Sequence, residues 1–348
     1  MIVVYSPHHI LHNPPKEFIS NHMEAYGESP ERVELIYEAL MDLPRVILTR
    51  AEEFDMRHFL KIHASAYLEY LQTAYGEWIA AGLWTEGIMP EFFALGKLRD
   101  HPPSKSPEGK AGYYMTDNCS MIVKDTWEAV RFSGFTALTG AKYLLKGESC
   151  VFSLCRPPGH HAGFDYAGGY CFVNNAALAA KFLQDQGRLK LNNSMKVGIL
   201  DLDFHHGNGT QDIVQRLENI LFVSIHGDPD HSYPYLTGFE SENTSKNVNF
   251  PLPPAITDED YLKVFLDAIS IMAHFDARYL IISFGVDTYE KDQLGNFKLS
   301  SKIYTRLAEY IISELNIPVL IVMEGGYNIE FLARNVLSFL TPFINSQH

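Results

Sequence analysis

The stretch MKVGILDLDFHHGNGTQD, residues 195–212, decides the fold of this chain. Its first half contains an apolar run, residues 197–202, without the strict alternation of a strand that has one face in water. Such a run is typical of a strand buried on both faces of a parallel sheet. The run leads directly to Asp203 and His205, and the sequence GNG at 207–209 suits a tight turn into a helix. The stretch therefore predicts an open α/β sheet with polar side chains at the carboxyl ends of its strands.

The same strand pattern recurs along the chain, at residues 2–5, 151–154, 220–225, 279–284 and 319–323. Helix-like stretches alternate with these runs. One begins at Ser29-Pro30, where an N-cap serine precedes a proline at the first helical position. The others cover about 57–75, 125–146, 174–186, 258–275, 300–315 and 329–341. This alternation predicts a single doubly wound α/β domain over residues 1–348, with a mostly parallel sheet flanked by helices.

The segment at about 83–123 does not follow this alternation. It contains four prolines and has weak hydrophobic periodicity, and a loop of that length inside a compact domain is usually functional or disordered. The aromatic and apolar sequence GYYM at 112–115 argues against disorder. We therefore predict an ordered insertion that serves as a lid or as a contact between subunits.

Composition narrows the classes of partner. The formal net charge is −14, which disfavours nucleic-acid binding, since that binding requires lysine and arginine at phosphates. The acidity suits cationic small molecules, although it could also serve solubility alone. The four cysteines have no CxxC spacing, and no apolar run reaches the roughly 20 residues of a membrane span. Because the start also lacks the pattern of a signal peptide, we expect a cytoplasmic protein with no membrane contact.

Three side chains at strand ends predict a metal site. Asp203 and His205 follow one strand, and Asp287 follows the run at 279–284. Two carboxylates and one imidazole form a plausible three-ligand set for Zn²⁺ or Fe²⁺ that leaves positions for water and substrate. A single aspartate at a strand end more often caps the next helix, but His160, His161, His205 and His206 nearby favour the metal site.

A hydrolytic metal site also needs a base and an electrophile. The tandem histidines His160 and His161 follow the rigid Pro-Pro-Gly turn of RPPGHH at 156–161 and can supply the base. Tyr327, after Gly325-Gly326, can stabilise a developing oxyanion, although a tyrosine at such a position often only packs. Asp201 can accept a hydrogen bond from a histidine and raise its basicity.

The motifs RPPGHHAG, GGYCFVNNAA, DLDFHHGNGTQD, FGVDTYEKD and MEGGY occur in this order over nearly the whole chain. Together they resemble the zinc-dependent deacetylases of the arginase–deacetylase fold, and within that family the acetylpolyamine amidohydrolases. The resemblance implies that Asp203, His205 and Asp287 bind zinc. It also implies that His160 and His161 form the catalytic pair, with His161 as the general base, and that Tyr327 polarises the acetyl carbonyl.

The resemblance extends to the substrate channel and to a second cation. It implies that Gly169 and Tyr170 line the channel, with Tyr233 as the opposite wall. It further implies a structural K⁺ beside the zinc, at positions that match Asp201, Asp203, His205 and Ser224.

Several positions depart from relatives or bear on the substrate. Asn208 stands where many eukaryotic lysine deacetylases have an aspartate, which should lower the pKa of His161. Glu108, in the insertion, matches an acidic residue expected to meet the ammonium of the substrate. A second expected acidic residue is replaced by Cys119, and Asp117 could compensate. Leu294 occupies a channel-rim position where some polyamine-selective relatives have a glutamate.

The function expected from the resemblance is hydrolysis of acetylated polyamines, such as acetylputrescine and acetylspermidine, to acetate and a free amine. The substrate would be a small cationic acetylated amine, and the insertion would form a homodimer. The main alternative is an acetyl-lysine protein deacetylase. Less favoured are an arginase-like ureohydrolase with two Mn²⁺ ions and a catalytically inactive scaffold.

Overall fold

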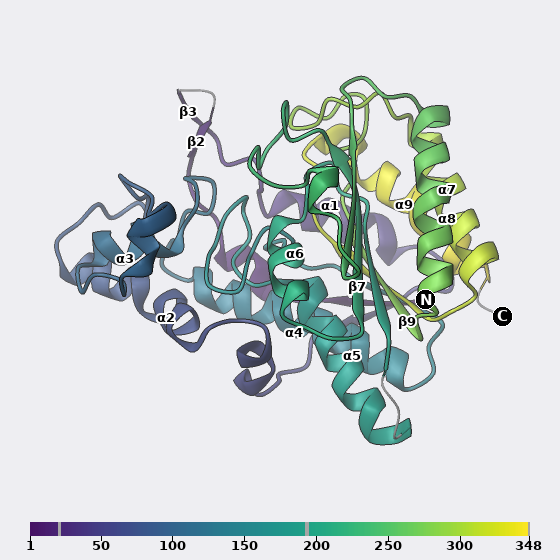
Figure 1. The fold of residues 1–348 in the computed structure, drawn as a ribbon, viewed down its shortest axis with the longest axis horizontal. Helices are drawn as coiled ribbons and strands as arrows, with labels where there is room; N and C mark the ends of the chain where they lie inside the picture. The colour runs from purple at the N-terminus through teal and green to yellow at the C-terminus, as the bar shows by residue number, and fades with distance from the viewer. Residues whose placement is uncertain (20–21, 192–194, 347–348) are drawn as a thin grey trace.

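An eight-stranded sheet forms the centre of the protein (Figure 1). The computed structural model describes residues 1–19, 22–191 and 195–346. The strand order is β4-β1-β5-β10-β9-β6-β7-β8, and every pair of neighbouring strands is parallel. The strands are β1 (Ile2–Tyr5), β4 (Ile47–Arg50), β5 (Cys150–Ser153), β6 (Val197–Asp201), β7 (Ile220–Gly227), β8 (Asn247–Leu252), β9 (Tyr279–Phe284) and β10 (Val319–Met323). The prediction of a parallel, doubly wound α/β fold is confirmed.

Helices cover both faces of this sheet (Figure 1). One face carries α1 (Glu31–Met41), α7 (Asp258–Phe275), α8 (Ser301–Leu315) and α9 (Ile329–Ser346). The other carries α2 (Ser65–Ala80), α4 (Thr126–Leu145), α5 (Asn175–Leu191) and α6 (Asn208–Gln215). Alternate residues of β10 belong to the two cores: Leu320 and Val322 to one, Ile321 and Met323 to the other. Burial on both faces explains the continuous apolar runs in the sequence.

The strands that the sequence did not reveal lie at the edges of the sheet or outside it. The edge strand β4 has the sequence ILTR and is partly exposed, and the opposite edge strand β8 reads NVNFPL. Edge strands need no continuous apolar run, which is why periodicity missed them. A separate antiparallel hairpin, β2 (Glu17–Ile19) and β3 (His22–Glu24), projects from the body (Figure 1). The helix predicted over 57–75 is divided into a 3₁₀ helix, η2 (Met56–Lys61), and α2.

The segment at 83–123 is ordered and packs against α2. It contains η3 (Gly96–Asp100) and α3 (Pro107–Tyr114), and the ring of Tyr114 stacks on Tyr70 of α2 with centroids 4.8 Å apart. The end of α3 is tied to the main body, since the N–H of Thr116 donates to the carbonyl of Ala167 at 2.9 Å. The insertion therefore delivers the residues that follow α3 to the edge of the pocket described below.

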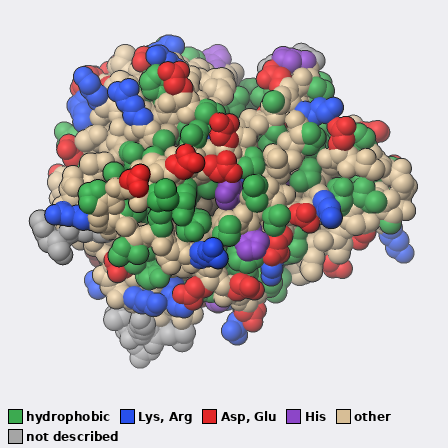
Figure 2. All heavy atoms as spheres, turned by 180° about the vertical axis from the view of Figure 1, so that it is seen from behind, with side chains coloured by type: hydrophobic (Ala, Val, Ile, Leu, Met, Phe, Trp, Pro, Cys, Tyr) green, Lys and Arg blue, Asp and Glu red, His purple; other side chains and the backbone are tan. Residues whose placement is uncertain are grey.

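Charged side chains of both signs are interspersed on the face shown in Figure 2. Exposed ion pairs occur on the surface of the protein, such as Arg306 with Glu259 at 2.6 Å. Pairs of this kind contribute little to stability, so the fold depends mainly on the two cores. Besides η2 and η3, the described residues form two further short 3₁₀ helices, η1 (Pro7–Leu11) and η4 (Glu240–Glu242).

Candidate active site

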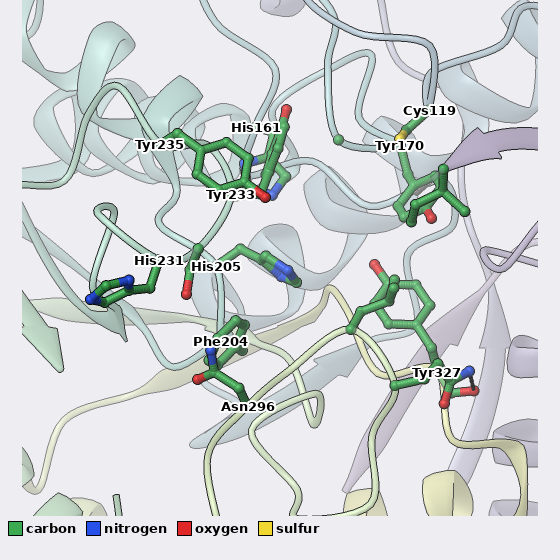
Figure 3. Close-up of a pocket in the computed structure, with 15 residues that line it drawn as sticks. Cys119, His161, Tyr170, Phe204, His205, His231, Tyr233, Tyr235, Asn296 and Tyr327 are labelled. Atoms are coloured by element: carbon green, nitrogen blue, oxygen red, sulfur yellow. Dashed lines mark hydrogen bonds between the residues drawn. The ribbon is translucent and has the colours of Figure 1, made fainter. Parts of the chain in front are cut away.

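Four adjacent strands, β5, β10, β9 and β6, end on one side of a pocket of about 360 Å³. The segments after these strands carry the histidine pair, Tyr327, Asp287 and the pair Asp203 and His205. In Figure 3, His161, His205 and Tyr327 face one another across the pocket. The prediction that polar residues from separate strand ends converge is correct, and this is the usual ligand position in an open α/β sheet.

The predicted metal ligands lie together. One donor atom from each of Asp203, His205 and Asp287 falls within 4.8 Å of the other two. His205 Nδ1 lies 3.2 Å from Asp203 Oδ1 and 3.0 Å from Asp287 Oδ2. Both carboxylates are completely buried. Burial and, after it, the charge of Asp203 raise the pKa of Asp287 to about 7, although the contact with His205 opposes this rise.

The second oxygen of each carboxylate is held by the backbone. Asp203 Oδ2 accepts a hydrogen bond from the N–H of Gly325 at 2.8 Å, and Asp287 Oδ1 accepts one from Phe204 at 2.9 Å. A Cβ at Gly325 would lie within 2.6 Å of both carboxylates, so only glycine fits there. The remaining oxygens and the imidazole are thus aimed at one point, and this donor set fits Zn²⁺.

His160 is held by carboxylates on two sides. Its Nδ1 lies 3.1 Å from Asp201 Oδ2, and its backbone N–H donates to Glu324 Oε2 at 3.2 Å. Although burial opposes protonation, the charges of Asp203 and Asp201 raise the pKa of His160 to about 10. These two carboxylates therefore favour the protonated form of His160.

His161 has the opposite character. Its Nδ1 lies 2.7 Å from Asn208 Oδ1, and an amide oxygen can only accept, so Nδ1 carries the proton. Burial, together with the positive charges of His160 and His205, lowers the pKa of His161 well below its usual value. The imidazole is neutral, and its Nε2 lone pair is available as a base.

Tyr327 closes the site from the loop after β10. Burial raises the pKa of its phenol well above 10, so the hydroxyl keeps its proton. The guanidinium of Arg32 lies 4.9 Å from its ring centroid, and the ring of Tyr170 lies 5.6 Å away. Together, His161 and Tyr327 place a base and a hydrogen-bond donor beside a three-ligand metal site, as hydrolysis of an amide requires.

Sequence comparison gives the family. The Histone deacetylase domain matches residues 26–342. The chain belongs to the histone deacetylase family. It is 37% identical to Acetylpolyamine amidohydrolase 1 of Pseudomonas aeruginosa over 348 residues, covering 99% of each chain. It is also 37% identical to Acetylpolyamine amidohydrolase of Mycoplana ramosa, covering 98% of each. The crystal structure of acetylpolyamine aminohydrolase from Burkholderia pseudomallei superposes with a TM-score of 0.90 at 32% identity, over 99% of this chain and 98% of that one.

Members of the histone deacetylase family are zinc-dependent deacetylases, which agrees with the donor set. Of the residues that the resemblance assigns to a potassium site, Asp201 of β6 and Ser224 of β7 are register partners. Asp201 Oδ1 also accepts the N–H of Asp203 at 3.1 Å.

The channel of this deacetylase has the predicted walls. Gly169, Tyr170, Tyr233, Leu294 and Cys119 all line the pocket. A Cβ at Gly169 would lie 2.3 Å from the ring of His161, and its φ is +52°, so glycine is required there.

The acidic residues of the insertion do not reach the pocket as free carboxylates. Asp117 accepts from the N–H of Gly169 at 2.7 Å and from the hydroxyl of Tyr233 at 2.6 Å, so it orders both channel walls instead of compensating for Cys119. Glu108 is exposed in the first turn of α3, where it accepts from Ser106 Oγ at 2.6 Å, and it does not line the pocket of its own chain.

Two residues that the sequence did not reveal hold the loop that carries Tyr327. Arg32 donates to the carbonyls of Gly326 and Glu324, at 2.7 and 2.6 Å, and so holds the loop before Tyr327. Asp292 accepts from the N–H of Tyr327 at 2.7 Å. Asp292 ends the motif FGVDTYEKD, and that position was the only signal in the sequence. Arg32 also donates to Glu28 Oε1, four residues earlier, at 2.6 Å. That spacing is an ordinary helix pattern and does not reveal the two backbone carbonyls.

Proposed function

We propose that this protein hydrolyses the N-acetyl amide of acetylated polyamines, such as acetylputrescine and acetylspermidine, using one zinc ion per subunit. The observation that carries the proposal is the placement of neutral His161 and protonated Tyr327 beside the trio Asp203, His205 and Asp287. The full-length similarity to proteins named acetylpolyamine amidohydrolases supports the substrate class.

Asp203, His205 and Asp287 would hold the zinc ion, which when bound would polarise the acetyl carbonyl and acidify the attacking water. His161 takes the proton of the attacking water at Nε2, and Asn208 keeps the other ring nitrogen protonated. The hydroxyl of Tyr327 donates a hydrogen bond to the carbonyl oxygen as negative charge develops there. His160 or His161 then returns a proton to the amine nitrogen, the C–N bond breaks, and acetate and a primary amine leave.

Asp201 and Ser224 support a second, structural cation, which we propose to be K⁺ held together with Asp203 and His205. The two residues are register partners in the adjacent strands β6 and β7. Potassium is a hard cation that suits oxygen ligands. This site would stabilise the strand end that carries two of the zinc ligands.

We further propose that the insertion forms a homodimer. Four large apolar side chains in it are exposed: Leu95 by 67%, Leu98 by 65%, Phe92 by 48% and Trp84 by 41%. An apolar group of this size on one projecting segment is typical of a protein contact. Light scattering of wild type and of a Leu95→Glu, Leu98→Glu double variant tests this proposal. We expect a dimeric wild type and a monomeric variant, and equal molar masses for the two proteins would contradict the proposal.

The proposed reaction requires no contact with a membrane. Among the described residues, no helix is both long enough and apolar enough to cross a bilayer. We propose a cytoplasmic location, where small acetylated amines would be accessible.

The deciding experiment measures kcat/KM of the zinc-loaded protein on acetylputrescine, acetylspermidine and an acetyl-lysine peptide. We expect at least a tenfold preference for the small amines, which corresponds to about 1.4 kcal/mol in transition-state binding. A preference for the peptide would instead assign an acetyl-lysine protein deacetylase. No turnover on any of the three, with zinc bound, would support an inactive scaffold.

A further inference from the structure

The pocket extends beyond the groups that the reaction uses. In Figure 3, Tyr170 and Tyr327 lie on one side of His205, and His231 and Asn296 lie on the other. The second part of the pocket, which we name the side lobe, is lined by Phe204, His231, Ser232, Tyr233, Tyr235 and Asn296. Apart from Tyr233, these residues have no part in the mechanism above.

Two buried acceptor atoms in the side lobe lack partners. Ser232 is only 5% exposed, and its Oγ has no hydrogen-bond partner among the described residues. The same holds for the buried Oδ1 of Asn296. The Asn296 backbone is fixed, since its carbonyl accepts from the N–H of Ala255 at 2.9 Å. Buried polar atoms are nearly always hydrogen-bonded, so two unpaired acceptors in one pocket indicate a ligand that donates to them.

The Ser232 hydroxyl lies close to Gly227 and to the ring of Phe204. A Cβ on Gly227 would lie 2.8 Å from Ser232 Oγ and 2.6 Å from Cζ of Phe204. The hydroxyl therefore lies beside an aromatic ring and an unsubstituted backbone position, neither of which offers a side-chain donor. Gly227 leaves the space that the hydroxyl and the ring occupy.

Aromatic rings line the same pocket and suit a cation. The rings of Tyr233 and Tyr235 lie nearly perpendicular, with centroids 6.3 Å apart, and Phe204 forms a third wall. No lysine or arginine of the described residues lines the pocket, which disfavours an anionic ligand. Aromatic faces combined with oxygen acceptors are the environment in which proteins bind ammonium groups.

We propose that the side lobe binds a second, positively charged nitrogen of the substrate, through Ser232 Oγ, Asn296 Oδ1 and the surrounding aromatic rings. The acetamide then lies between His161 and Tyr327 while the amine chain turns past His205 into the lobe. This inference rests on the proposed function and adds a recognition site for the polyamine chain. Such a recognition site would favour an acetylated polyamine over a neutral amide of similar size.

The test compares acetylspermidine with the neutral amide N-butylacetamide for wild type, Ser232→Ala and Asn296→Leu. We expect the ratio of kcat/KM for acetylspermidine to that for N-butylacetamide to fall about tenfold in each variant. An Asn296→Asp variant should raise the ratio, because a carboxylate attracts the ammonium more strongly. Ser120→Ala is the matched control: Ser120 is also buried with an Oγ unpartnered among the described residues, but it does not line the pocket.

Binding of spermidine, measured by calorimetry on the zinc-loaded proteins, separates this inference from the proposed function. If wild type hydrolyses acetylspermidine, the ratio of the two kcat/KM values decides. A ratio within twofold of wild type in all three lobe variants would overturn the proposed binding in the side lobe and leave the proposed function intact. If wild type does not hydrolyse acetylspermidine, the function fails and affinity decides. Spermidine binding weakened about tenfold by Ser232→Ala and Asn296→Leu would then support the lobe, and equal affinities would overturn it.

Discussion

Asp292 Oδ2 accepts the backbone N–H of Tyr327 at 2.7 Å, and the same oxygen accepts that of Asn328 at 2.9 Å. Its other oxygen accepts the N–H of Leu294 at 3.0 Å. One carboxylate therefore joins the loop after β9, which contains the zinc ligand candidate Asp287, to the loop after β10, which carries Tyr327. The position of the phenol relative to the metal site depends on this carboxylate.

Replacing this carboxylate should slow the chemical step. We expect Asp292→Ala to reduce kcat by roughly 10–100-fold with a smaller change in KM, because misplacing a catalytic group by about 1 Å can cost that much. Asp292→Asn should be intermediate, since its single amide oxygen can still accept on one side. Steady-state kinetics at saturating zinc measure this effect. Wild-type kcat in Asp292→Ala, with an unchanged zinc content, would show that Tyr327 is placed by other contacts.

Removing the hydroxyl of Tyr327 tests the oxyanion role directly. Tyr327→Phe should reduce kcat by on the order of 10²–10³, the effect of losing one oxyanion donor. Zinc content should stay the same, because the ring lies outside the trio of ligands. Single-turnover kinetics and metal analysis check both points. A variant with undiminished turnover would exclude the phenol from catalysis.

Metal removal should abolish activity reversibly. The donors of Asp203, His205 and Asp287 converge within 4.8 Å, so we expect dialysis against a chelator to remove one zinc ion and all turnover. Added Zn²⁺ should restore both, and Asp203→Ala should bind zinc poorly. Activity that survives in a metal-free protein would contradict this assignment. The exposed variant Glu259→Gln serves as the control for a lost carboxylate.

The sequence revealed what burial and metal chemistry impose directly. The strands at 279–284 and 319–323 were predicted to the residue, because strands buried on both faces must be continuously apolar. The convergence of Asp203, His205 and Asp287 followed from their positions at strand ends. The edge strand β4 was missed because a partly exposed strand carries no such pattern.

Residues that act through the backbone could not be predicted in the same way. Asp117 and Asp292 bind N–H groups, which every residue but proline has, so no partner side chain marks them in the sequence. Asp117 was considered as a replacement for the acidic residue missing at Cys119, yet both its oxygens are used within the protein. Local motifs thus identify the reacting groups, whereas the contacts that position them depend on the tertiary structure.

A buried histidine outside the reaction connects two motifs of the site. His63 Nδ1 lies 2.9 Å from the carbonyl of Gly163, just after the histidine pair, and its Nε2 accepts the N–H of Asn174 at 3.0 Å. These two contacts require a neutral ring protonated at Nδ1. Burial lowers the pKa of His63 to about 4.

Stability should therefore depend on the protonation of His63. Above pH 6.5, the ordinary pKa of an unfolded histidine, neither state binds the proton and the contacts are intact. As pH falls from 6.5 towards 4, the unfolded chain binds a proton that the folded protein excludes, so stability falls by up to about 1.4 kcal/mol per pH unit. His63→Gln cannot titrate: it should be about 1–3 kcal/mol less stable than wild type at pH 7.5, and the difference should shrink towards pH 5. Urea unfolding at pH 7.5, 6.5, 5.5 and 5, with zinc held constant, measures both proteins, and the exposed variant His274→Gln is the control. Parallel stability curves for wild type and His63→Gln would show that His63 does not contribute to the acid sensitivity.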